Sequence, residues 1–314
     1  MLVKKPSAAS TLKEAVWIDL VDPTDAERAE VERELGLGLP TRADIEEIES
    51  SSRVYVEDDA LYLSTPMLTG DDCLTHGLTA VGFVLTRTCL VTLRFAKIAA
   101  FEQLLDKAEK TAEPQASDAF LKLLEAVVDH AADALEHAGS ELESISLRAF
   151  RGERPRKRDH DKTSEDLRSA LRHLGRISDG ISHLRDSLLG MGRIAAFVHE
   201  TARETHLGGD QPRLSAIKGD VASLNDYQAH LVAKVQFLLD ATLGFINIQQ
   251  NDIVKTLTIV SVAGVPPVLI AGIYGMNFHV MPELSWPLGY PYALGLIVVS
   301  TLVPLAWLKW RGWM

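Results

Sequence analysis

The stretch that decides the fold is TLTIVSVAGVPPVLIAGIYGMNFHV, residues 256–280, which contains no Asp, Glu, Lys or Arg. A second run without these residues, LSWPLGYPYALGLIVVSTLVPLAWL, occupies residues 284–308. Each run has about 25 residues, whereas about 20 apolar residues suffice for a helix to cross the hydrocarbon core of a bilayer. Both runs therefore predict transmembrane helices, and the lipid bilayer is an expected partner.

Basic residues beside the two runs predict their orientation. Lys255 precedes the first run, and Lys309 and Arg311 follow the second. The loop between the runs carries Glu283 and no basic residue. Because cytoplasmic flanks carry an excess of Lys and Arg, both chain ends are predicted to be cytoplasmic and the loop to face outward.

The part of the chain before the membrane is strongly acidic. Residues 1–251 carry a formal charge near −12, because two of the 43 acidic and three of the 32 basic residues lie beyond them. Such a charge repels nucleic acid, so no nucleic-acid partner is expected, and it attracts cations. Plain solubility is the alternative reason for it. No P-loop, nucleophile elbow or zinc-protease motif is found, so an enzyme is not expected.

Residues up to about 112 alternate strand-like and helical stretches, which predicts an α+β domain with a mixed sheet flanked by helices. Thr24 is expected to open one helix, and Thr41 with Asp44 has the form of a capping box for a short helix through Glu49. The last four strands are close together, which favours antiparallel hairpins. The predicted strands are Val16–Leu20, Val54–Glu57, Leu61–Leu68, Leu78–Thr86 and Cys89–Phe95.

Three longer helices are predicted next. Apolar residues at three- and four-residue steps indicate a helix from about Ser117 to Phe150 and an antiparallel partner from about Thr163. The last helix begins near Arg213 and meets no proline before Pro266, so it should run unbroken into the membrane as a stalk. Pro266-Pro267 should bend or loosen it. The predicted segments are a cytoplasmic α/β domain (1–115), a long antiparallel helical pair (116–212), a stalk helix (213–256), transmembrane helix 1 (257–275), a periplasmic loop (276–287), transmembrane helix 2 (288–308) and a basic cytoplasmic tail (309–314).

One face of the stalk helix carries candidate pore-lining residues. Two membrane helices cannot enclose a water-filled path, so transport would require an oligomer. The membrane part of the stripe is small and mostly apolar, and its cytoplasmic part offers amide and carboxylate oxygens, which suit a hard cation. A coiled-coil seam with register-fixing asparagines is the alternative. The stripe consists of Asp240, Gly244, Asn247, Asn251, Val254, Leu257, Thr258, Ser261, Val265 and Val268.

The loop between the two runs carries a short signature. Tyr274-Gly275-Met276-Asn277-Phe278, followed by Met281-Pro282-Glu283-Leu284, resembles the YGMNF…MPEL signature of the CorA family of divalent-cation transporters. The resemblance extends over the whole architecture. It implies a homopentameric inner-membrane channel for Mg²⁺, and also for Co²⁺ and Ni²⁺, which closes when intracellular Mg²⁺ binds between its funnel-shaped cytoplasmic domains.

The resemblance also implies roles for single residues. Asn277 would form a ring that meets the hydrated ion, and Tyr274, Gly275 and Met276 would complete the selectivity loop, with Gly275 allowing a tight backbone turn. Leu257 matches the gate leucine, and Asn251 and Asp240 match polar positions lower in the stalk. Val254 and Val265 stand where methionines are common, and Val268 where a threonine is. The regulatory Mg²⁺ sites cannot be matched, and the pairs Asp58-Asp59 and Asp71-Asp72 are interpreted as turn residues.

Two other functions stay open. The first is a Zn²⁺ transporter of ZntB-like type, with or without proton coupling, to which His279 could contribute a ligand; Cys73 with His76 is a weak zinc motif. The second is a membrane-anchored structural or sensing protein that conducts no ion.

Overall fold

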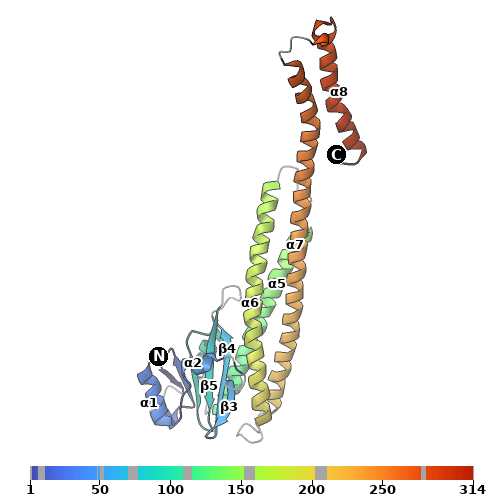
Figure 1. Ribbon diagram of the computed structural model, residues 1–314. Helices are drawn as coiled ribbons and strands as arrows, with labels where there is room; N and C mark the ends of the chain where they lie inside the picture. The colour runs from blue at the N-terminus through green and yellow to red at the C-terminus, as the bar shows by residue number, and fades with distance from the viewer. Residues whose placement is uncertain are drawn as a thin grey trace. The chain divides into compact units, whose positions relative to one another are not determined.

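The structure is a computed structural model of the 314-residue chain (Figure 1). It describes residues 2–5, 11–47, 49, 53–69, 77–108, 115–151, 160–201, 211–276 and 281–313. The chain divides into two compact units, Met1–Leu239 and Asp240–Met314, and the boundary between them falls inside one long helix.

A six-stranded sheet forms the centre of the first unit. Its strand order is β1-β2-β6-β5-β4-β3, with β2 and β6 parallel and all other neighbours antiparallel, which confirms the predicted mixed sheet. Strand β1 was not predicted, because two of its four residues are lysines and it offers only one short antiparallel edge. The strands are β1 (Leu2–Lys5), β2 (Trp17–Val21), β3 (Val54–Glu57), β4 (Ala60–Leu68), β5 (Leu78–Leu85) and β6 (Leu90–Arg94).

Short helices cover one face of the sheet. Val31 of α1 (Asp25–Leu35) and Ile45 of α2 (Arg42–Glu46) pack with the side chains that the strands direct to that face. Both helices begin with the capping boxes that Thr24 and Thr41 open. Helix α2 ends at Glu46, earlier than predicted, because the backbone of Glu47 is already extended. A 3₁₀ turn, η1 (Leu12–Glu14), precedes β2.

Longer helices cover the opposite face, as Figure 1 shows for α5 and α6. Phe83 of the sheet lies between Phe101 of α4 and Phe120 of α5, with ring centroids 6.3 and 5.8 Å away. At Gly190 of α6 an added Cβ would overlap Thr65 of β4, so the helix lies very close to the sheet. The helices are α4 (Ala99–Ala108), α5 (Ala116–Arg151), α6 (His160–Thr201) and the first part of α7 (Gln211–Tyr274).

A buried ion pair lies on the α4 side of the sheet. Because β2 and β6 are parallel and in register, Asp19 lies opposite Thr92, two residues before Arg94. Arg94 Nη2 donates to Asp19 Oδ2 and to Glu102 Oε1, at 2.8 Å each, and Thr92 Oγ1 donates to Asp19 Oδ1 at 2.6 Å. Burial alone would lower the pKa of the Arg94 guanidinium, but these partners raise it overall.

Helices α5, α6 and α7 also form a bundle of their own within the first unit. Leucines such as Leu142, Leu184 and Leu231 are buried at its centre. At the start of α7, Arg213 pairs with Asp118 and Glu125 of α5 at 2.9 Å. Ion pairs as well as apolar packing therefore hold the beginning of the predicted stalk helix against the rest of the first unit.

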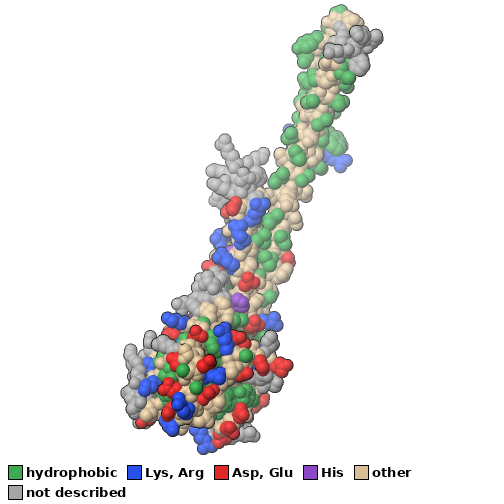
Figure 2. Space-filling model, turned by 60° about the vertical axis from the view of Figure 1, so that its left-hand side comes forward, with side chains coloured by type: hydrophobic (Ala, Val, Ile, Leu, Met, Phe, Trp, Pro, Cys, Tyr) green, Lys and Arg blue, Asp and Glu red, His purple; other side chains and the backbone are tan. Residues whose placement is uncertain are grey.

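The second unit contains the rest of α7, a 3₁₀ turn η3 (Pro282–Ser285) and α8 (Gly289–Trp310). Helices α7 and α8 are long and apolar enough to cross a membrane, which agrees with the two predicted spans. Hydrophobic side chains dominate the face of this unit visible in Figure 2, whereas charged ones are scattered over the first unit. Helix α7 continues through Pro266 and Pro267 without an interruption in its helical assignment.

Candidate functional site

The predicted pore-lining stripe lies on the surface of α7 within the second unit. At about 100° per residue, its positions fall within roughly 140° of the helix circumference, so they form one continuous face. Gly244 and Thr258 are half-buried, and the other members are exposed: Asp240, Asn247, Asn251, Val254, Leu257, Ser261, Val265 and Val268.

The apolar part of this stripe is unusually accessible for its composition. Leu257 is 65% exposed, Val265 61% and Val268 71%. Isolated apolar side chains on a surface are ordinary, but a contiguous apolar face of this kind marks a contact with lipid or with another protein surface. A single chain therefore leaves this face to be covered by something else.

Thr258 interrupts the apolar part with a hydroxyl group, and Thr256 carries another on the opposite side of α7. Thr258 Oγ1 donates to the Val254 carbonyl at 2.8 Å, and Thr256 Oγ1 donates to the Asp252 carbonyl at 2.9 Å. Each hydroxyl proton is donated to a carbonyl of the helix backbone. The Thr258 hydroxyl oxygen therefore keeps lone pairs that can accept a further hydrogen bond. A hydroxyl held in this way can accept a hydrogen bond from a hydrated cation or contact the cation itself.

The polar part of the stripe carries side-chain oxygen atoms of two kinds, amide and carboxylate. Asn251 and Asn247 carry amide oxygens, and Asp240 carries a carboxylate about 16 Å further along the helix from Asn251, at 1.5 Å per residue. Amide and carboxylate oxygens are the ligands that Mg²⁺ and Ca²⁺ prefer. In one chain the Asp240 carboxylate is too far from the Asn251 amide for both to bind one ion.

The structure describes the two ends of the predicted selectivity loop. Gly275 N–H donates to the Ala271 carbonyl at 3.0 Å, and Met276 N–H donates to the Ile273 carbonyl at 3.2 Å, which ends α7 next to Tyr274. A Cβ at Gly275 would lie 3.2 Å from the Ala271 oxygen, one helical turn earlier in the chain, which is a tight contact. Asn277, like His279, lies outside the described residues.

On the other side of the loop, η3 docks on the first turn of α8. Trp286 N–H donates to the Glu283 carbonyl at 3.3 Å, and Gly289 N–H donates to the Trp286 carbonyl at 3.0 Å. The rings of Trp286 and Tyr292 meet edge to face, with centroids 6.0 Å apart.

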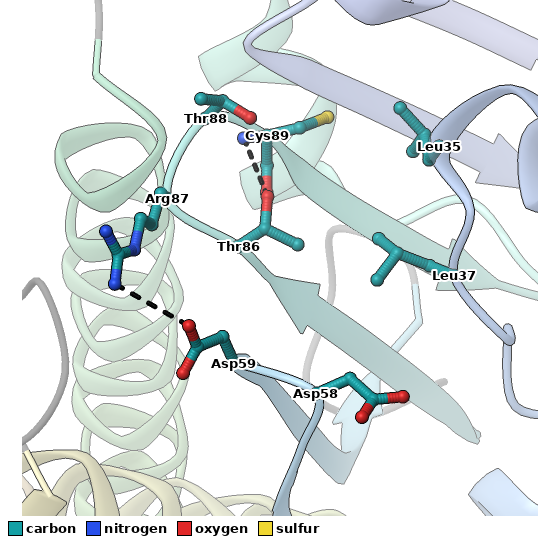
Figure 3. A pocket seen from close by; sticks show the side chains of 8 residues that line it. All are labelled: Leu35, Leu37, Asp58, Asp59, Thr86, Arg87, Thr88 and Cys89. Carbon is teal, nitrogen blue, oxygen red and sulfur yellow. Dashed lines mark hydrogen bonds and ion pairs between the residues drawn. The ribbon is translucent and has the colours of Figure 1, made fainter.

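The acidic pair Asp58-Asp59 forms the β3–β4 turn, as predicted. Both residues have positive φ values, 47° and 60°, which Asp tolerates better than most residues. Asp59 lies 3.6 Å from Arg87, across a cavity of about 280 Å³ that Figure 3 shows. Burial raises the pKa of Cys89 in its wall to about 12, so this thiol is protonated at neutral pH.

Within the described ranges, no three His, Cys, Asp or Glu side chains come together in a way that could hold a metal ion. The pair Asp71-Asp72 and the residues Cys73 and His76 lie outside those ranges. The candidate site of this chain therefore consists of the α7 stripe and the two described ends of the loop.

Comparisons with known proteins agree with this arrangement. A family model described as CorA-like Mg²⁺ transporter protein matches residues 13–310. The magnesium transport protein CorA of Escherichia coli (strain K12) is 35% identical over 305 residues, which cover 96% of this chain and 93% of that protein.

Two solved structures share the fold. The CorA magnesium transporter of Methanocaldococcus jannaschii matches with a TM-score of 0.74 at 21% identity, covering 97% of this chain and 93% of that one. The cytoplasmic domain of ZntB from Vibrio parahaemolyticus is more distant, with a TM-score of 0.51 at 12% identity, covering 74% of this chain and 87% of that domain.

Proposed function

Because the chain belongs to the CorA-like Mg²⁺ transporter family, whose members are ion transporters and not enzymes, we propose that it forms a channel that conducts Mg²⁺ across a membrane. The observation that carries the proposal is the exposed α7 stripe, which is apolar within the membrane run and rich in oxygen atoms beyond it. Copies arranged around this face would enclose a path that a single chain cannot form. A homopentamer is the assembly that we propose.

Asn277 acts at the entrance. Mg²⁺ gives up its water reluctantly, so a ring of neutral amide oxygens can select the hydrated ion through hydrogen bonds to its water shell. Neutral groups also release the ion again, as conduction requires. Tyr274, Gly275 and Met276 complete this selectivity loop, and Co²⁺ and Ni²⁺, whose hydrated ions resemble that of Mg²⁺, are further substrates.

Leu257 and Val254 form the narrow apolar part of the path. A ring of such side chains can close a pore by excluding water. Thr258, Ser261, Val265 and Val268 line the path above this ring. The hydroxyl groups of Thr258 and Ser261 and the methyl groups of the two valines bind the ion only weakly.

Asn251, Asn247 and Asp240 form oxygen rings on the cytoplasmic side of the path. The negative charge of the soluble part raises the local cation concentration there. Both termini lie in the cytoplasm and the loop in the periplasm, so the membrane potential across the inner membrane drives influx.

Intracellular Mg²⁺ closes the channel in this proposal. An ion shared between neighbouring copies would stabilise the closed packing of their acidic units, and its loss would let the helices move. The described residues of one chain supply no complete site, so such a site would draw ligands from two copies.

Ion-resolved flux in proteoliposomes tests the function. We expect the wild-type protein to admit Mg²⁺ down its gradient, and Asn277→Ala to lose selective Mg²⁺ uptake while it assembles normally on size-exclusion chromatography. Asn225→Ala is the control, because it removes an amide that bonds to the α7 backbone and lies outside both the stripe and the loop. Unchanged Mg²⁺ selectivity in Asn277→Ala would contradict the proposed entrance.

The same assay separates the other functions. Zn²⁺ flux that exceeds Mg²⁺ flux and grows with a pH gradient would instead establish a proton-coupled zinc transporter, which the distant ZntB likeness keeps as the second candidate. No flux of any divalent ion under any gradient would point to a structural or sensing protein.

A further inference from the structure

Gly289 is buried although its neighbours are not. It opens α8, and Leu288 and Tyr290 on either side of it are 68% and 77% exposed. What covers Gly289 is the backbone of η3, six residues earlier in the chain. This close approach of two backbone segments distinguishes Gly289 from the other described glycine of α8, Gly295, which has nothing within 4 Å of an added Cβ.

A side chain at Gly289 would not fit. An added Cβ would overlap the carbonyl oxygen of Glu283, would lie 3.3 Å from the carbonyl carbon of that residue, and would be 3.6 Å from Trp286 Cβ. The obstacle is backbone, which cannot turn away as the end of a flexible side chain could. Alanine at this position would therefore displace η3 from α8, although alanine favours helices intrinsically.

The docked turn holds one end of the selectivity loop. The hydrogen bonds of Gly275 and Met276 fix the other end to α7. Only residues 277–280 separate Met276 from Met281, so five Cα–Cα steps join the two fixed ends, and these span at most about 18 Å. A shift of η3 therefore moves one of the two points to which the segment that contains Asn277 is attached.

We propose that Gly289 is a positioning residue for the ion entrance: it admits η3 onto the first turn of α8, and Trp286 against Tyr292 secures that docking. This role rests on the proposed function of the loop. Recognition of an ion through its water shell depends on where the oxygen ring stands, and a misplacement of about 1 Å is enough to weaken a positioned interaction strongly. Gly289 thus acts on selection of the ion without touching it.

The test compares Gly289→Ala with Gly295→Ala in the full-length protein in proteoliposomes, with Mg²⁺ flux measured as a function of external Mg²⁺. We expect Gly289→Ala to raise the half-saturating Mg²⁺ concentration about fivefold or more and to weaken discrimination against Zn²⁺, with a smaller change in maximal flux. Gly295→Ala should match the wild type in all three quantities. A merely structural effect would lower the amount of assembled protein and leave the half-saturating concentration unchanged.

A second variant, Trp286→Leu, removes the aromatic contact without adding a clash, and it should shift the half-saturating concentration in the same direction. If Gly289→Ala fails to assemble, a wild-type half-saturating concentration in assembled Trp286→Leu overturns the inference. Equal behaviour of Gly289→Ala and Gly295→Ala in a conducting protein also overturns it. Absence of Mg²⁺ flux in the wild type is a different result, which overturns the proposed function and this role with it.

Discussion

The two units of the chain treat their apolar side chains in opposite ways. In the first unit they form three buried clusters, two on the faces of the sheet and one inside the α5–α6–α7 bundle. In the second unit most large apolar side chains remain exposed, and α8 buries only Gly289 and Leu308. The first unit thus has its core within one chain.

Because of this difference, the residues that stabilise the fold and the residues expected to affect flux lie in different units. Apolar burial is the main favourable term in folding, so the first unit has what it needs to fold in water. The exposed apolar helices of the second unit require lipid or another apolar surface instead. Substitutions in the first unit should therefore change the free energy of unfolding, and substitutions on the α7 stripe should change flux.

The largest effect is expected from Arg94→Met in the first unit. The change leaves the buried Asp19 carboxylate without its cationic partner, and breaking a buried pair from one side costs about 3–5 kcal/mol. Hydrogen exchange by mass spectrometry on peptides from β2 and β6 would show the loss of protection.

Arg42→Met is the matched control for that variant. Arg42 pairs with Glu46 at 2.7 Å, but both side chains are at least half exposed, so solvent screens the pair and its removal should change exchange protection far less. Equal protection in the two variants would show that the buried ion pair is not what stabilises the join between β2 and β6.

A smaller effect, and of a different kind, is expected from Leu257→Ala on the stripe. If Leu257 closes the pore by excluding water, as proposed, shortening its side chain should raise Mg²⁺ flux at high internal Mg²⁺ roughly tenfold, which corresponds to a barrier lower by about 1.4 kcal/mol. Proteoliposomes loaded with millimolar Mg²⁺ would measure it. Exchange protection of the first unit should not change.

Val260→Ala controls for the loss of apolar volume on the same helix. Val260 is 63% exposed, much like Leu257, but it lies outside the stripe. If Val260→Ala leaks as much as Leu257→Ala, the pore-lining face has been placed wrongly around the helix.

Sequence patterns predicted the elements of the first unit better than their pairing. β-Branched runs indicated strands β2 to β6, and the close spacing of the last four favoured their antiparallel order. The parallel pairing of β2 with β6 joins residues more than 70 positions apart, so no local pattern contains it. The buried contact of Asp19 with Arg94 depends on that pairing and was missed for the same reason.

In the candidate site, too, local patterns were predicted from the sequence and contacts between separate segments were missed. Periodicity predicted the α7 stripe, because residues three and four apart share a helix face. The docking of η3 at Gly289 was missed, because it depends on how close two backbone segments approach. Gly275 lies in the hydrogen-bonded turn that ends α7, and the reason for glycine at this position stays a prediction, because its φ is not among the positive values.

The smallest effect tests the charged contact that fixes the start of α7 in the first unit. Arg213→Met removes its bonds to Asp118 and Glu125, and since these groups are about one-third exposed, screening limits the cost to about 1 kcal/mol. Hydrogen exchange should show faster opening of the first turns of α7. Lys218→Met, at an exposed position one turn further on, should leave exchange unchanged.

The pH dependence of this contact follows from Asp118. Partial burial alone would raise the pKa of its carboxyl group, but hydrogen bonds from Lys122 and Arg213 lower that pKa overall. A lowered pKa means that the contact stabilises the fold above the unfolded-state value, about 3.9, and that this stabilisation is lost as pH falls through the folded-state pKa. The difference in exchange between wild type and Arg213→Met should therefore be full at neutral pH and should shrink below about pH 4. A difference that persists unchanged in acid would mean that the contact does not depend on the charge of the Asp118 carboxylate.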